Sequence, residues 1–273
     1  MDAHVECGPC VLRQALDTVR ETDADVATER RAVRRTATAI GEMSFDRTPM
    51  TIAARAQAIV REETGIDDPF GDRKRLATET VADMRPALVD RLDGAADRFE
   101  RAVRLAIAGN VIDVGPGHEV DIEATIDDVL DRSFAIDRLD ALRADLADAD
   151  DVLYLLDNAG EVVLDRLLIE SIDADVTAVA KADPFLNDVT AADAFAAGID
   201  EVATVETRGT DGVGTITDGF ADRLRAADVV ISKGQGNYEL FSDCDASIYF
   251  LLLVKCGVVA DDIGAPEGSV VVA

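Results

Sequence analysis

The sequence predicts an α/β protein, with a Rossmann-like α/β/α sandwich, a mostly parallel sheet and an all-helical N-terminal domain. The first hundred residues carry apolar side chains at three- and four-residue spacing, the pattern of amphipathic helices. Later residues alternate short apolar runs with helical segments, which implies right-handed crossovers and a parallel sheet. These runs lack polar alternation, as in strands buried on both faces. We therefore expect two domains, residues 1–107 and 108–273.

The helical pattern continues from residue 9 to about residue 104 without a strand signal. Thr51, which follows Thr48-Pro49, is expected to cap a helix, and a break falls at residues 67–71. The expected helices span residues 11–19, 30–43, 52–64, 73–89 and 95–105.

In the second half, short runs rich in Val, Leu and Ile have the length of strands. The expected strands span residues 152–156, 176–180, 202–205, 229–232, 248–254 and 269–272. The expected helices between them span residues 161–171, 190–197 and 218–227.

Charge is the strongest compositional feature. Fifty-five acidic residues against 27 basic ones give a formal net charge of −28, which argues against nucleic acid and anionic lipid as partners. The acids are interleaved with apolar residues, which make up 48% of the chain, so a folded core is expected. Self-repulsion of this size is tolerable in concentrated salt, where the Debye length falls to about 3 Å at 1 M. The composition predicts a salt-adapted protein.

The chain shows no secretory or membrane signal. Residues 1–10 contain Asp2, His4 and Glu6 instead of a basic start and an apolar run, and the longest apolar stretch, residues 248–254, is too short to span a bilayer. Four cysteines in a chain of this length do not make a disulfide scaffold. We expect a cytoplasmic protein without membrane contact; the sequence does not define its oligomeric state.

Polar side chains follow the expected strands, where an open parallel sheet binds its ligands. Asp157-Asn158 follows the first strand, and Lys181 and Asp188 follow the second. Residues 233–239, which begin with Lys233 and end with Glu239, follow the fourth, and Lys255-Cys256 follows the fifth. Each of these segments taken alone is also compatible with ordinary turn chemistry. Their convergence on one sheet edge predicts a functional site.

The residue types at this edge indicate phosphoryl transfer. Asp157, Asn158 and Asp188 offer hard oxygen ligands, which suit Mg²⁺, Mn²⁺ or a similar divalent ion. Lys233 and Lys255 are candidates for holding a phosphate, and the backbone N–H groups of residues 234–237 for an anion nest. A metal flanked by ammonium groups neutralises charge and activates water for attack on a phosphate ester.

Several motifs together resemble the metal-dependent damage-control phosphatases, whose eukaryotic relatives have also been described as acidic-residue methyltransferases. The resemblance covers nearly the whole chain in the right order, and the Cys-x-x-Cys opening is similar to that of the prokaryotic subgroup. The motifs are Cys7-x-x-Cys10, Asp68-Pro69-Phe70 with Lys74, Gly109-Asn110-x-x-Asp113, Asp157-Asn158-Ala159-Gly160-Glu161, Lys181-x-x-Pro184-x-x-Asn187-Asp188-x-Thr190, Lys233-Gly-x-Gly-Asn237-x-Glu239 and Leu-x-x-Lys255-Cys256.

The resemblance implies a helical part packed on a Rossmann-like domain and one divalent metal, Mn²⁺, Co²⁺, Ni²⁺ or Mg²⁺, bound by Asp157, Asn158 and Asp188. It also implies hydrolysis of sugar phosphates or damaged phosphometabolites, so that the expected partner is a small phosphorylated metabolite. The expected substrate- and phosphate-binding residues are Asn110, Asp113, Lys181, Lys233, Asn237, Glu239 and Lys255. Water attack and a phosphoryl-enzyme on Asp157 both remain open, with Glu239 or Asp113 orienting the water.

The cysteines have three interpretations. Cys7 and Cys10 pack the first helix, or join Cys256 and His4 in a second, soft metal site, or form a redox pair. No strand precedes them, which disfavours a thioredoxin-like site, and packing is the preferred interpretation. Cys244 is expected to have no role.

Two competing functions are an S-adenosylmethionine-dependent carboxyl methyltransferase and a non-enzymatic metal- or nucleotide-binding protein. A Rossmann methyltransferase needs an acidic residue at the end of the second strand to hold adenosine. Lys181 stands there instead, so the phosphatase is favoured.

Overall fold

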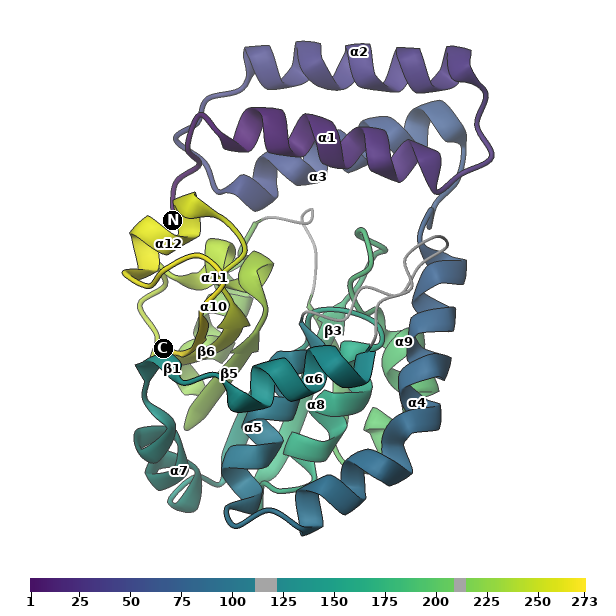
Figure 1. The fold of residues 1–273 in the computed structure, drawn as a ribbon. Coiled ribbons are helices and arrows are strands. Elements are labelled where there is room, and N and C mark those ends of the chain that lie inside the picture. The colour runs from purple at the N-terminus through teal and green to yellow at the C-terminus, as the bar shows by residue number, and fades with distance from the viewer. Residues whose placement is uncertain (111–121, 209–214) are drawn as a thin grey trace.

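A seven-stranded sheet lies at the centre of the molecule (Figure 1). The computed structural model describes residues 1–110, 122–208 and 215–273. The strand order is β1-β7-β6-β5-β2-β3-β4, and neighbours are parallel except for the antiparallel pair β6–β7. The strands are β1 (Phe134–Asp137), β2 (Asp151–Leu155), β3 (Asp175–Lys181), β4 (Thr204–Arg208), β5 (Val229–Lys233), β6 (Ile248–Leu253) and β7 (Val270–Val272). The predicted mostly parallel α/β sheet is confirmed.

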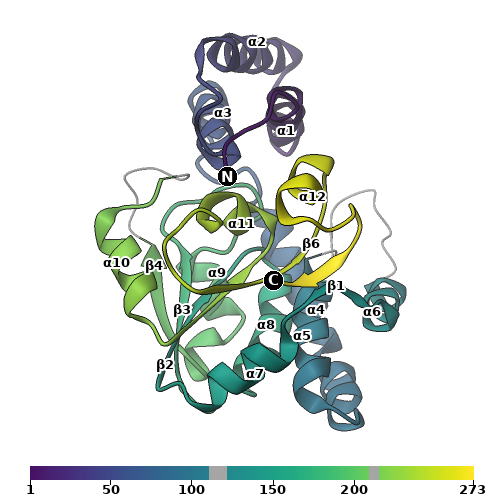
Figure 2. The same ribbon diagram turned by 90° about the vertical axis from the view of Figure 1, so that its left-hand side faces the viewer.

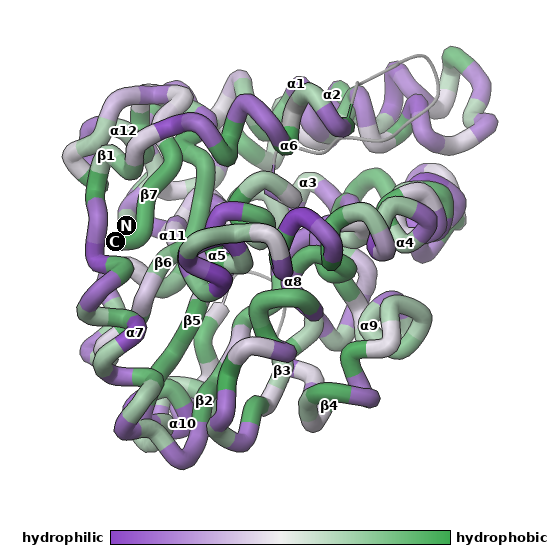
Figure 3. The backbone as a smooth tube through the Cα atoms, turned by 60° about the horizontal axis from the view of Figure 1, so that its bottom comes forward, coloured by the Kyte–Doolittle hydropathy of each residue, from purple (hydrophilic) through white to green (hydrophobic). Residues whose placement is uncertain are grey.

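Alternate residues of each central strand enter two different hydrophobic cores. In β2, Val152 and Tyr154 join one core, whereas Leu153 and Leu155 join the other. This burial on both sides explains why the strands read as continuous apolar runs, since neither face meets water. Figure 3 shows hydrophobic residues concentrated along β2, β5 and β6. β1 was not predicted, because its four residues alternate between half-buried and exposed positions and form too short a pattern.

Helices cover both faces of the sheet. The eight predicted helices agree with the structure to within a few residues at each end, whereas α6, α7, α11 and α12 were not predicted. The helices are α1 (Cys7–Arg20), α2 (Val26–Glu42), α3 (Pro49–Thr64), α4 (Gly71–Asp93), α5 (Arg98–Gly109), α6 (Ile122–Asp131), α7 (Leu139–Ala147), α8 (Glu161–Ile169), α9 (Ala191–Ala196), α10 (Asp218–Ala226), α11 (Gln235–Phe241) and α12 (Gly257–Ile263). Thr48 rather than Thr51 caps α3, with its side chain accepting from the Thr51 N–H. Within the described ranges, none of these helices has the length and apolar character needed to cross a bilayer.

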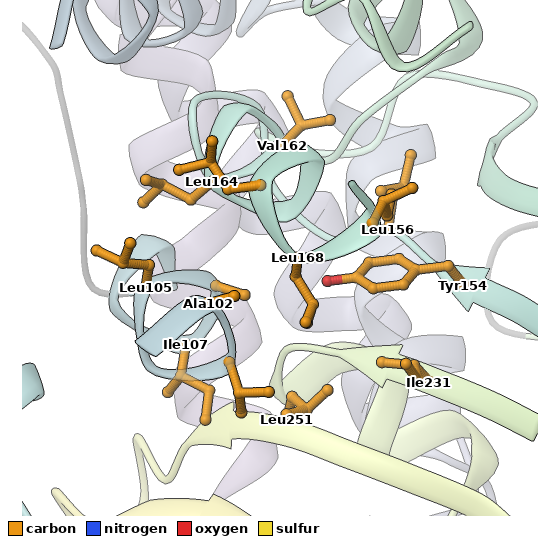
Figure 4. Close-up of a cluster of buried hydrophobic side chains, with 14 of the residues drawn as sticks. Ala102, Leu105, Ile107, Tyr154, Leu156, Val162, Leu164, Leu168, Ile231 and Leu251 are labelled. Carbon is orange, nitrogen blue, oxygen red and sulfur yellow. The ribbon is translucent and has the colours of Figure 1, made fainter. Parts of the chain in front are cut away.

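The helical N-terminal region divides between two layers. α1, α2 and α3 pack on one another as a separate layer (Figures 1 and 2), whereas α4 and α5 pack on α8 against the sheet. Leu88 of α4 and Ile107 of α5 belong to the same core as Tyr154 of β2, and Figure 4 shows Ile107 and Tyr154 together with Leu168 of α8. The structure thus divides the helical domain expected at residues 1–107. Residues up to about 64 form the separate α1–α3 layer, whereas α4 and α5 belong to the α/β sandwich. Periodicity identifies the apolar face of a helix but not the surface that it covers.

The sheet has a topological switch at β2. β3 and β4 lie on one side of β2, and β5 and β6 lie on the other. Crossovers therefore leave β2 and β5 in opposite directions, which opens a crevice beyond their carboxyl ends. The α1–α3 layer reaches this edge, since Arg61 of α3 donates a hydrogen bond of 3.1 Å to the carbonyl oxygen of Pro184 in the loop after β3.

We predict that Leu168→Ala lowers the free energy of unfolding by about 2–5 kcal/mol, because it leaves a cavity where α5, α8 and the sheet meet. Leu76→Ala on α4 is the matched control, since Leu76 is 43% exposed, and it should change stability by less than about 0.5 kcal/mol. Denaturant titration of both variants in molar salt measures the difference. Equal losses would contradict the assignment of Leu168 to the core.

Candidate functional site

Two loops at the carboxyl edge of the sheet are joined by backbone hydrogen bonds. The Val189 N–H donates to the Asp157 carbonyl at 2.8 Å, and Asn158 forms an antiparallel bridge with Asp188. The β2–α8 loop and the β3–α9 loop are therefore held side by side. The three predicted metal ligands, Asp157, Asn158 and Asp188, come together as the strand-end reasoning required.

These loops form one wall of a pocket of about 460 Å³, and helices α1 and α3 form another. This is the size typical of sites for small molecules. The predicted residues on its wall are Asp157, Asn158, Asp188, Glu239, Lys255, Cys7, Cys10 and Cys256. The predicted residues Asn110, Lys181, Lys233 and Asn237 lie behind the wall, and Asp113 lies outside the described residues.

Gly234, between β5 and α11, makes room for the Asp157 carboxylate. Its φ of +77° is rare for residues with a side chain, and a Cβ there would lie 1.8 Å from Asp157 Oδ2. Its N–H donates to the Leu251 carbonyl at 3.1 Å, so it is not available to the anion nest expected at residues 234–237. The loop after β3 also contains Leu186, whose φ of +49° is unfavourable for its type. Strained backbone of this kind is concentrated at functional sites.

The Asp157 carboxylate is buried and held by two amides. Asn110 Nδ2 donates to Oδ2 at 2.9 Å, and Asn158 Nδ2 donates to the same oxygen at 2.7 Å. Burial raises the pKa of Asp157, and the nearby Glu161 carboxylate raises it further. The first effect comes from lost hydration of the carboxylate, and the second comes from a neighbouring negative charge.

Lys233 lies in a buried ion cluster and does not reach the pocket. Its Nζ donates to Glu161 Oε1 at 2.5 Å, to Asp165 Oδ1 at 2.6 Å and to the Ala106 carbonyl at 2.8 Å. Burial acts to lower the pKa of Lys233, but the carboxylates of Asp165 and Glu161 outweigh it and raise that pKa. All three N–H donors of the ammonium are used, and they join β5 to α8 and α5. Lys233 therefore has no free donor for the phosphate contact that the sequence predicted.

Glu161 connects this ion cluster to the pocket. Its Oε2 accepts from Asn158 Nδ2 at 2.9 Å and from Asn110 Nδ2 at 3.1 Å, while its Oε1 binds Lys233. Both amides that hold Asp157 are therefore oriented by the same buried carboxylate.

The sequence reasoning did not select Glu161 or Asp165 as site residues. A signal was present, because they stand four residues apart in the apolar helix α8 and thus share one face. Both are fully buried. Burial raises the pKa of Asp165 to about 7, against the opposing effect of Lys233.

Lys181 and Asn237 support the site from behind. The ammonium of Lys181, buried at the end of β3, pairs with the Asp188 carboxylate. Asn237 Nδ2 donates to the carbonyl oxygens of Leu156 at 3.0 Å and Lys233 at 2.9 Å, which ties the end of β2 to the end of β5. Both residues thus fix the geometry of the strand ends.

The residues present fit a divalent cation. Four carboxylates are buried around the strand ends: those of Asp157, Glu161, Asp165 and Asp188. Lys181 pairs with Asp188, and Lys233 pairs with Glu161 and Asp165. Within the described residues Asp157 has amide donors but no ion-pair partner, and unpaired buried charge is costly. Two carboxylates and an amide on the pocket wall are the oxygen donors that Mg²⁺ and Mn²⁺ accept. The buried Asn110 Oδ1 also has no hydrogen-bond partner in the described part of the chain.

Lys255 and Glu239 are the remaining predicted charges on the pocket wall. The exposed Lys255 follows β6, and its N–H donates to Gln235 Oε1 at 2.8 Å. Gln235 Nε2 in turn donates to Glu239 Oε1 at 2.9 Å. One amide side chain therefore fixes the positions of both segments.

Cys7, Cys10 and Cys256 line the pocket as free thiols. Burial raises the pKa of Cys7 and of Cys10, which is opposite to the lowered pKa of a reactive redox thiol. In the described ranges no three His, Cys, Asp or Glu side chains are arranged to hold a metal, so a second metal site is not supported there. Cys244 is remote from this pocket.

Comparison with known proteins matches the whole chain. The family model described as the damage-control phosphatase ARMT1-like domain matches residues 3–271. A protein of Methanocaldococcus jannaschii named as uncharacterized is 34% identical, with 97% of this chain and 92% of that protein covered. A protein of Pyrococcus horikoshii named damage-control phosphatase is 33% identical, with 99% and 97% covered. One of Archaeoglobus fulgidus with the same name is 35% identical, with 81% and 80% covered.

A solved structure matches the fold over its full length. The crystal structure of a DUF89 family protein from Pyrococcus horikoshii has a TM-score of 0.88 and 32% sequence identity, and the match covers 100% of this chain and 98% of that one. The arrangement of the helical layer on the sheet is therefore shared with an experimentally determined protein.

Substituting Lys233 and substituting Lys255 should have different effects on the stability of the protein, although the sequence assigns both residues the same role. We predict that Lys233→Met lowers the free energy of unfolding by about 3–5 kcal/mol, because two buried carboxylates lose their counterion. Lys255→Met removes an exposed ammonium and should change it by less than about 0.5 kcal/mol. Denaturant titration of both variants tests this, and a stable Lys233→Met protein would refute the ion cluster.

Proposed function

Because the chain belongs to the damage-control phosphatase ARMT1-like family and is a metal-dependent phosphatase, we propose that it hydrolyses small phosphorylated metabolites at the pocket between α1, α3 and the sheet edge. The relatives from Pyrococcus horikoshii and Archaeoglobus fulgidus that bear the name damage-control phosphatase support this proposal. The observation that carries it is the buried carboxylate of Asp157, which has no ion-pair partner in the described residues and lies on the pocket wall with the oxygen donors of Asn158 and Asp188.

Asp157, Asn158 and Asp188 are the proposed metal ligands. Asn110 and Glu161 orient Asp157 and Asn158, and the Lys181 pair holds Asp188. A divalent cation supplies Lewis-acid neutralisation of phosphoryl charge there, and Mn²⁺, Co²⁺, Ni²⁺ and Mg²⁺ are the candidate ions. Supporting hydrogen bonds of this kind determine ligand direction, so these partners are part of the site.

Lys255 is the proposed phosphate contact. It is the single ammonium or guanidinium side chain on the pocket wall within the described residues. A flexible ammonium donates to any phosphate oxygen within reach and offsets the charge that develops during transfer.

The competing functions receive less support. Lys181 ends β3 and pairs with Asp188, so the position where an adenosine-binding methyltransferase needs a carboxylate is occupied by an ammonium. Membership of a phosphatase family also leaves no reason to assign a purely sensory role.

The proposed setting is a cytoplasm of high salt. The net charge of −28 supports this setting. Such a surface repels a phosphorylated substrate, and concentrated salt screens this repulsion.

We predict that Asp157→Asn reduces metal-dependent turnover more than 100-fold. Loss of a residue behind a metal ligand costs about 10–100-fold, and loss of a ligand charge should cost more. Release of inorganic phosphate from p-nitrophenyl phosphate in molar salt, with Mn²⁺ or with chelator, measures this. Asp150→Asn, which removes an exposed charge before β2, is the control and should retain wild-type rates. Turnover that survives chelation, or an active Asp157→Asn protein, would refute the proposal.

We predict that the free energy of unfolding increases from 0.2 to 2 M KCl, because salt screens repulsion among the surface carboxylates. Urea titrations at each salt concentration measure the change, since urea adds no ions. Sucrose at equal osmolality is the control and should stabilise less. A stability that is independent of KCl would contradict salt adaptation.

A further inference from the structure

Two carboxylates on the pocket wall, those of Glu6 and Glu239, are not among the proposed metal ligands. The charged residues of this wall are Glu6, Asp157, Asp188, Glu239 and Lys255. Under the proposed function, Asp157 and Asp188 bind the metal and Lys255 contacts the phosphate. Glu6 is exposed, whereas Glu239 is half-buried. Glu239 is therefore the less exposed of the two wall carboxylates that are not proposed metal ligands.

Glu239 is held in place but not neutralised by a side-chain cation. Its hydrogen-bond donor is the neutral amide of Gln235, at 2.9 Å. No Lys or Arg in the described part of the chain forms an ion pair with it, and the amino group of Met1 donates to its backbone carbonyl and pairs with Asp243. Burial raises the pKa of Glu239, and the charge of Asp157 raises it further. The side chain thus lacks a positive partner.

Gln235 holds the Glu239 carboxylate and the backbone of Lys255 on the same wall. Its Oε1 accepts from the backbone N–H of Lys255, and its Nε2 donates to Glu239. A carboxylate in a fixed position and a flexible ammonium therefore share this wall. Near α1 and α3 the wall carries the apolar side chains of Val11 and Met50 together with the amide of Gln14. Such a wall accommodates a small alcohol group between the two charges.

We infer that Glu239 selects phosphate monoesters whose alcohol part carries an ammonium group and no second anion; this rests on the proposed function. A carboxylate accepts hydrogen bonds and repels anions, so it favours a cationic donor at this position. A second anion on the substrate would meet Glu239 and Glu6 with Lys255 already engaged by the phosphate. The substrate class is therefore that of the phosphorylated amino alcohols.

The test compares three esters built on the same two-carbon alcohol: O-phosphoethanolamine, 2-hydroxyethyl phosphate and 2-phosphoglycolate. For each, kcat/KM is measured on the metal-loaded protein in molar salt, for wild type and for Glu239→Gln, which keeps the shape and removes the charge. The readout is the ratio of ammonium ester to carboxylate ester. Comparing this ratio between wild type and Glu239→Gln removes the contribution of the intrinsic reactivity of the esters, which is the same for both proteins.

We expect Glu239→Gln to lower this ratio by roughly 10- to 100-fold, the value of a hydrogen bond to a charged group. Glu239→Asp should restore part of the ratio, and Glu42→Gln, on the exposed face of α2, should leave it at the wild-type value. An unchanged ratio in Glu239→Gln, or an equal loss on all three esters, would overturn the inference. If metal-dependent hydrolysis of p-nitrophenyl phosphate is still present in wild type, the proposed function stands; if no ester is hydrolysed, both fail.

Discussion

The buried ammonium of Lys233 is the interaction on which the site depends. It binds Glu161 and Asp165 of α8 and the carbonyl of Ala106 in α5, so one side chain joins β5 to two helices. Glu161 then orients the amides of Asn110 and Asn158, and these hold Asp157. A buried charge is stable only with its partners in place, so the geometry of the pocket wall follows from the core beneath it.

Much of the sheet could be predicted from the sequence, because apolar runs of strand length leave little choice of structure. The rule that ligands bind beyond the carboxyl ends of parallel strands correctly brought Asp157, Asn158 and Asp188 together. The family resemblance is confirmed by a model that matches residues 3–271. β1 was missed, since its pairing with β7 depends on contacts distant in sequence.

The sequence could not predict whether the side chain of each lysine points into the core or toward the pocket. Lys233 is the last residue of β5 and is buried in the core, whereas Lys255 lies two residues beyond the end of β6 and lines the pocket. The last residue of a strand faces one side of the sheet or the other according to pairing register, and one residue of difference reverses the result. The carboxylates that bind Lys233 lie on a different element, so only the assembled fold brings them together.

Two parts of the fold form the pocket, and substitutions in one of them can change the shape of the pocket independently of the other. The oxygen donors come from loops anchored in the sheet, whereas Val11 and Met50 come from the α1–α3 layer. Substitutions in α1 or α3 can therefore reshape the cavity while leaving the chemistry intact. Positions on α1 and α3 that line the pocket are therefore places to alter the shape of the cavity without touching the proposed metal ligands.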